Sequence, residues 1–196
     1  MKKIHSALLL ATALLLAAPA ASAQDAAQKA RLATIREAYS SAMELAKKNQ
    51  AEQTRNTQVF QSVQTDPNGV WKRKLEFVCN LDYLEELDLY TPDVVFIRQD
   101  NGGYLQEFLF DKEGVLMFVF ERSDPGEDDE TVEYRYYYDD EGVPFWKIEK
   151  QINAKTKKTL STKQEPVEEA DGSALFLTRV ANDLKTAFYA LNVMYD

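Results

Sequence analysis

The chain has 196 residues, a formal net charge of −9, one histidine and one cysteine. An acidic surface disfavours nucleic acid and anionic membranes as partners. One cysteine can form neither an internal disulfide nor a cysteine cluster for zinc. His5 lies in a predicted leader, so the mature chain is expected to lack the commonest general acid/base and metal ligand. We therefore expect no cofactor.

The N-terminus has the pattern of a secretory signal peptide. Lys2 and Lys3 precede a short Leu- and Ala-rich run, and Ala21-Ser22-Ala23 forms a small-residue cleavage box. The run is shorter than the about 20 apolar residues of a membrane span. We predict cleavage after Ala23, with residues 1–23 as signal peptide and 24–196 as one periplasmic or secreted domain without membrane insertion. Cleavage would remove Lys2 and Lys3, so the expected net charge of the mature chain is −9 − 2 = −11.

The remaining chain predicts helices at both ends and strands between them. Apolar residues recur at helical spacing over residues 25–48, and again after Ser173, which is expected to cap a closing helix. The period changes to that of strands over residues 57–150. The apolar residues of its first part alternate with polar ones, as in half-buried strands: Val59, Val63, Trp71, Leu75 and Phe77. Residues 92–98 are predicted as a central strand, 82–90 as a short helix or crossing loop, and 153–164 as an exposed strand end or loop.

Three turn signals divide the strand region. Asp66–Val70, Asp111–Val115 and Asp139–Val143 each begin with Asp and have Gly before the final Val, which favours bulged hairpin turns. Residues 106–121 also align without gaps on 134–149, at an offset of 134 − 106 = 28. One hairpin design is repeated, which predicts an antiparallel meander. The fold class is therefore α+β: a mostly antiparallel β-meander with the N- and C-terminal helices packed on one face.

The turns also predict which side chains share a face. If the Gly forms the bulge, Phe110 lies opposite Leu116. One face is then aromatic and expected to be core: Phe108, Phe110, Leu116, Phe118, Phe120, Tyr136, Tyr138, Trp146 and Ile148. The other face is mixed and is the hypothetical interaction patch: Leu109, Met117, Arg135, Tyr137, Phe145 and Lys147.

Other chemical features of the sequence leave alternatives open. The acidic segment 124–130 is either a solvated hairpin tip or a site for calcium or a basic partner, although it lacks the ligand spacing of an EF-hand. Asp111 and Asp139–Glu141 offer carboxylates to a hydrolase, but both Asp residues also begin turns. Cys79 ends an apolar strand pattern and is expected to be a buried, inert thiol.

Two resemblances follow from these patterns. The leader, the Ala-rich helix, the two aromatic hairpins and the closing Leu184–Phe188 helix resemble a group of uncharacterised exported proteins of Bacteroidetes bacteria. Over about 45 residues, the Asp-x-Glu-Gly-Val hairpins are also similar to the MORN-like repeats of some bacterial antitoxins, too short a run for a repeat array. Neither resemblance implies an activity or functional residues.

The sequence thus predicts a non-catalytic exported protein of the cell envelope that binds a protein or peptide, such as an inhibitor or accessory subunit. A homodimer is compatible with this prediction. The alternatives are a hydrolase that uses carboxylates alone and a calcium-responsive binding protein.

Overall fold

The computed structural model describes residues 4–52, 56–66, 69–84, 89–123, 125, 129–168 and 171–192. The chain forms two compact units, residues 1–37 and residues 38–196. Its elements are α1 (Ile4–Glu52), β1 (Thr57–Asp66), β2 (Gly69–Leu84), β3 (Leu89–Asp100), β4 (Tyr104–Phe110), β5 (Leu116–Ser123), β6 (Glu130–Tyr138), β7 (Pro144–Asn153), β8 (Thr159–Pro166) and α2 (Gly172–Asn192). Helix α1 contains both the predicted leader and the predicted helix 25–48, and cleavage after Ala23 stays a prediction. No helix among the described residues is long and apolar enough to cross a membrane.

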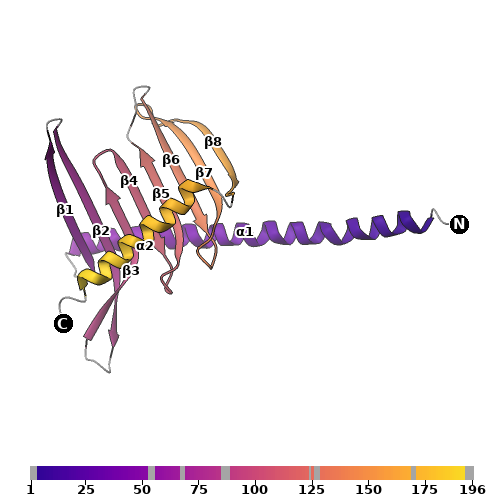
Figure 1. Ribbon diagram of the computed structural model, residues 1–196, viewed down its shortest axis with the longest axis horizontal. Coiled ribbons are helices and arrows are strands. Elements are labelled where there is room, and N and C mark those ends of the chain that lie inside the picture. The colour runs from indigo at the N-terminus through magenta and orange to yellow at the C-terminus, as the bar shows by residue number, and fades with distance from the viewer. Residues whose placement is uncertain are drawn as a thin grey trace. The chain divides into compact units, whose positions relative to one another are not determined.

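The strands of the second unit form one sheet in chain order, β1 to β8, and every neighbouring pair is antiparallel (Figure 1). This confirms the α+β class and the predicted meander. Strands β1 and β8 are the two edges of the sheet in the described part of the chain.

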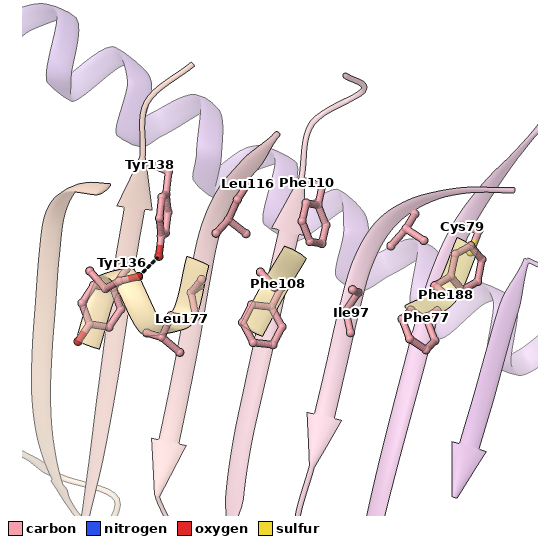
Figure 2. Packing of buried hydrophobic residues seen from close by; sticks show 14 residues of the cluster. Phe77, Cys79, Ile97, Phe108, Phe110, Leu116, Tyr136, Tyr138, Leu177 and Phe188 are labelled. Carbon is pink, nitrogen blue, oxygen red and sulfur yellow. Dashed lines mark hydrogen bonds between the residues drawn. The ribbon is translucent and has the colours of Figure 1, made fainter. Parts of the chain in front are cut away.

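Helix α2 lies across one face of the sheet, which we call the α2 face (Figure 1). The helix contributes Ala174, Leu177, Ala181 and Phe188 to a buried cluster, and the Phe188 ring lies 4.9 Å from that of Phe77 on β2. The sheet contributes Phe77, Cys79, Val94, Ile97, Phe108, Phe110, Leu116, Val119, Tyr136 and Tyr138, several of which Figure 2 shows together with Leu177 and Phe188 of α2. Burying one aliphatic or aromatic side chain stabilises a fold by about 1.5–3 kcal/mol, so this cluster is the main core.

The opposite face of the sheet packs against residues 38–52 of α1, and we call it the α1 face. Tyr39 contacts Phe118 and Phe96, with ring centroids 5.0 and 6.2 Å apart. Phe96 and Ile97 are neighbours in β3, so they point to opposite faces, and Ile97 belongs to the α2-face core. The expectation that both helices pack on one face was therefore wrong in this respect. The sheet is apolar on both faces, and each face has its own helix.

The hairpin turns form as predicted where the structure describes them. The backbone N–H groups of Asp111 and Asp139 bond to the carbonyls of Val115 and Val143, both at 2.9 Å, and Phe110 lies opposite Leu116. Gly114 and Gly142 have φ of 77° and 76°, the left-handed conformation that favours Gly. In the turn that begins at Asp66, residues 67 and 68 lie outside the described residues.

The predicted face of each side chain was wrong in the strand after each turn, because that strand contains a further bulge. Phe110 pairs with Leu116 but Leu109 pairs with Phe118, so Met117 is an extra residue in β5. Likewise Tyr138 pairs with Pro144 and Tyr137 with Trp146, so the extra residue in β7 is Phe145. A bulge inverts the alternation that follows it. Phe118, Phe120, Trp146 and Ile148 therefore lie on the α1 face, and Val119 and Lys147 lie on the α2 face.

Two further expectations are corrected, and one is confirmed in part. Residues 82–84 and 89–90 extend β2 and β3, where a short helix or crossing loop was expected. Of residues 153–164, expected as an exposed strand end or loop, 159–164 lie in the exposed edge strand β8. The cap of α2 is Asp171 and not Ser173, since Asp171 Oδ1 accepts hydrogen bonds from the N–H groups of Ser173 at 3.0 Å and Ala174 at 3.1 Å.

Candidate functional site

The six residues of the predicted interaction patch do not form one exposed surface. Leu109, Met117 and Tyr137 are 2%, 6% and 3% exposed. Arg135 is partly exposed on the α1 face and Lys147 lies on the α2 face, where its Nζ is 5.3 Å from the Tyr134 ring centroid. Phe145 lies at its bulge and is partly buried. A binding role for the six residues stays a prediction.

A buried charged cluster joins α1 to the sheet. Tyr39 donates a hydrogen bond to Glu107, which is 3% exposed, and Arg98 Nε donates to the same carboxylate at 2.8 Å. The Arg98 guanidinium also lies over the Phe96 ring, 5.6 Å from its centroid. Burial, followed by the charge of Glu107, raises the pKa of the Tyr39 hydroxyl well above its usual value. The cluster neutralises a buried carboxylate, which is a structural role.

A second polar chain crosses strands β2 to β5 on the α2 face. Arg73 donates to Gln99, Gln99 Nε2 donates to Gln106 Oε1 at 3.1 Å, and Gln106 Nε2 donates to Glu121 Oε1 at 2.8 Å. Tyr104 donates a further hydrogen bond to Glu121. The Gln and Glu side chains of this chain are all buried. Their hydrogen bonds are made within the sheet, as buried polar groups require.

The buried carboxylates are divided between the two faces of the sheet. Glu76 and Glu107 lie on the α1 face, on either side of Arg98, whereas Glu121 lies on the α2 face. Glycoside hydrolysis needs two carboxyl groups on either side of one bond. Asp111 Oδ1 is bonded to the N–H of Val115 at 2.7 Å, so this Asp has the structural role expected of a turn. These described residues supply no observation in favour of a hydrolase.

The acidic segment 124–130 is only partly described. Asp129 forms an ion pair with Lys155, and residues 124 and 126–128 lie outside the described residues. Within the described part, no group of three or more His, Cys, Asp or Glu could hold a metal ion. The calcium alternative stays a prediction.

Cys79 is buried as predicted, at 1% exposure, in the core beneath α2. Burial is the larger cause that raises the pKa of its thiol to about 12, and the charge of Asp93 is the smaller. A thiol with so high a pKa is a poor nucleophile near neutral pH, because the thiolate is the reactive form.

A cavity of about 390 Å³ lies at the end of the sheet between the β5–β6 and β7–β8 connections. Its lining contains the cations Arg122 and Lys157 and the carboxylate of Glu133, which Arg135 holds at 2.7 Å. Such a volume suits a small ligand. Charges of both signs line it, and the adjoining residues 126–128 are not described, so the cavity does not indicate one class of ligand.

The edge strand β1 is the strongest candidate for a contact surface. Val59 and Val63 are 51% and 57% exposed on the α1 face, and Phe60 is 39% exposed on the α2 face. Next to them, Val70 of β2 is 60% exposed. An edge strand with exposed apolar side chains is a ready template for another strand.

Sequence reasoning missed this surface, although it recognised the alternation of Val59 and Val63 with polar residues. That pattern predicts a strand, but it does not tell an edge strand from a central one. An edge strand is identified by its position in the sheet. Strand β1 is the first strand of the meander, and nothing in the described chain pairs with its outer side.

No protein-family model, no curated protein and no solved structure matches the chain.

Proposed function

We propose that the protein is a non-catalytic, exported interaction module of the cell envelope that binds a protein or peptide by strand addition at β1. The observation that carries this proposal is the outer edge of β1, with which no other described strand pairs, and its exposed Val59, Phe60 and Val63. In strand addition, backbone hydrogen bonds supply affinity, and the alternating side chains supply specificity. Inhibitors and accessory subunits can use such an edge to pair with a partner.

The contrast between the two edges supports β1 as the binding edge. Strand β8 contains Lys163 and Glu165 and ends at Pro166. Charge and Pro on an edge strand oppose pairing with other chains. Strand β1 has no Pro, and its one charged residue is Asp66 at its end. One edge is thus protected against pairing and the other is open to it.

Export is proposed from the leader pattern of residues 1–23. A periplasmic or secreted location would bring β1 into contact with envelope proteins. The acidic net charge of −9 favours partners other than nucleic acid.

Site-specific photo-crosslinking in living cells tests the proposal. A photoreactive phenylalanine analogue replaces Val63 in one variant and Val143 in the matched control, since both valines are about half exposed, at 57% and 52%. We expect a discrete adduct from position 63, identified by its mass and peptides, and none from position 143.

A second pair of variants checks that the adduct depends on the edge. With the analogue kept at position 63, Val59→Lys places a charge on β1 and should abolish the adduct, whereas Val143→Lys should leave it unchanged. No adduct from position 63, or equal adducts from 63 and 143, would refute binding at β1.

A further inference from the structure

The backbone hydrogen bonds of β1 show which of its groups face outward. The N–H of Cys79 bonds to the carbonyl of Asn56 at 2.8 Å, and the pairing of β1 with β2 continues without a register shift. In an antiparallel pair, every second residue bonds to the neighbouring strand. The even-numbered residues Gln58, Phe60 and Ser62 therefore bond to β2. The odd-numbered residues direct their N–H and C=O groups to the free edge: Thr57, Val59, Gln61, Val63 and Thr65.

The sequence of β1 is nearly the same in both directions. Residues 57–65 read Thr-Gln-Val-Phe-Gln-Ser-Val-Gln-Thr. The run is symmetric about Gln61, except that Phe60 corresponds to Ser62. No residue in it is charged, so two copies brought together do not repel each other.

We propose that β1 pairs with β1 of a second copy of this chain, antiparallel and with a two-fold axis at Gln61. This inference rests on the proposed function, because it names the partner of the same edge. Val59 of each copy then lies opposite Val63 of the other, and Thr57 lies opposite Thr65. Gln61 lies opposite itself. The interface is isologous, as in most protein dimers.

In this pairing, every outward backbone N–H and C=O group of residues 57–65 forms a hydrogen bond with the second copy. All five odd-numbered residues fall in hydrogen-bonded pairs, and two bonds per pair give about ten backbone hydrogen bonds. Val59 and Val63 of both copies lie on the α1 face, so four exposed valines become neighbours across the junction. The two eight-stranded sheets become one continuous sheet.

Disulfide trapping tests the register, because only one residue lies opposite itself. In Gln61→Cys the two Cα atoms are about 5.5 Å apart, within the range of a disulfide. In the control Val63→Cys the two Cα atoms are about 14 Å apart, because they are offset by about 13 Å along the strands and by about 5.5 Å across the pair. Cys79 is buried and does not compete. Under oxidised glutathione we expect at least ten-fold more covalent dimer from Gln61→Cys than from Val63→Cys.

A mixing experiment checks the same register with cysteines at two different positions that lie opposite each other. Val59→Cys and Val63→Cys proteins should each remain monomeric on non-reducing gels, and an equal mixture should give a covalent heterodimer. Urea unfolding of each variant, compared with the unsubstituted protein, confirms that the substitutions at this exposed edge leave the fold intact.

The results separate this inference from the proposed function. Photo-crosslinking at Val63 that yields two copies of this chain, together with preferential trapping at Gln61, supports both. An adduct with a different protein and no preferential trapping at Gln61 overturns self-pairing but leaves β1 as a binding edge. No adduct at all, with no trapping, overturns both.

Discussion

The hydroxyl of Tyr39 donates a hydrogen bond to the buried carboxylate of Glu107, which lies 68 residues further along the chain. Arg98 bonds to the other oxygen of that carboxylate and neutralises its charge. The same Tyr ring packs on Phe118 and Phe96. This one side chain therefore attaches residues 38–52 of α1 to the sheet by both a polar and an aromatic contact.

Tyr39→Phe should destabilise the protein by about 1–3 kcal/mol, because it removes one partner of a buried acceptor and keeps the ring. Tyr39→Ala should cost more, since the ring contacts are lost as well. Urea unfolding followed by circular dichroism measures both. Equal stability of Tyr39→Phe and the unsubstituted protein would show that the hydrogen bond to Glu107 does not contribute to the free energy of unfolding.

Phe118→Ala and Tyr137→Ala should each cost about 3–5 kcal/mol, the usual range for a buried aromatic residue. The two rings lie 5.1 Å apart on the α1 face and are 4% and 3% exposed. The control Phe176→Ala removes a ring that is 61% exposed on α2 and should change stability by less than about 0.5 kcal/mol. A small loss for Tyr137→Ala beside a large loss for Phe118→Ala would place Tyr137 on the surface and contradict its pairing with Phe118, which depends on the extra residue Met117 in β5.

Gly142→Ala should destabilise the protein by about 1–2 kcal/mol, because Gly142 has φ of 76°. A Cβ there would also lie 3.2 Å from Cγ1 of Val115. The matched control is Gly172→Ala at the start of α2, where a Cβ meets nothing within 4 Å. That change should stabilise by about 0.4–1 kcal/mol. Thermal unfolding of the two variants should therefore shift in opposite directions, and a shift in the same direction contradicts the turn conformation.

Cys79 should react slowly with thiol reagents in the native protein at pH 8 and rapidly in denaturant, because it is buried and its pKa is raised to about 12. The raised pKa also predicts how the stability of the protein changes with pH. The contribution of Cys79 to stability is fully present below the ordinary thiol pKa of about 9 and is lost as the pH rises through about 12. Removal of the thiol in Cys79→Ala should therefore flatten part of the loss of stability above pH 9. Rapid labelling of the native protein would show that the thiol is accessible.

Much of the fold could be predicted from local sequence. The Asp-x-Glu-Gly-Val runs set the hairpins and the pairing of Phe110 with Leu116, because a left-handed Gly and an Asp acceptor are local requirements. The bulges could not be predicted. Residues 116–120 are all apolar, so nothing in the pattern identifies Met117 as the extra residue. The placement of the two helices on opposite faces depends on contacts such as Tyr39 with Phe118, which are distant in sequence.

The candidate site was less predictable than the fold. The mixed patch was deduced from an alternation that the bulges invert, so it combined residues of both faces. The free edge of β1 depends on the position of the strand in the complete sheet, which the composition of residues 57–65 does not contain.

Hydrogen exchange of the β1 amides at several protein concentrations is the most direct test of β1 as a self-pairing edge. The amides of Phe60 and Ser62 bond to β2 and should be protected at every concentration. The amides of Val59, Gln61 and Val63 face outward and should exchange rapidly in dilute protein but slowly in concentrated protein, as two copies pair. Rapid exchange of these three amides at every concentration would contradict the account.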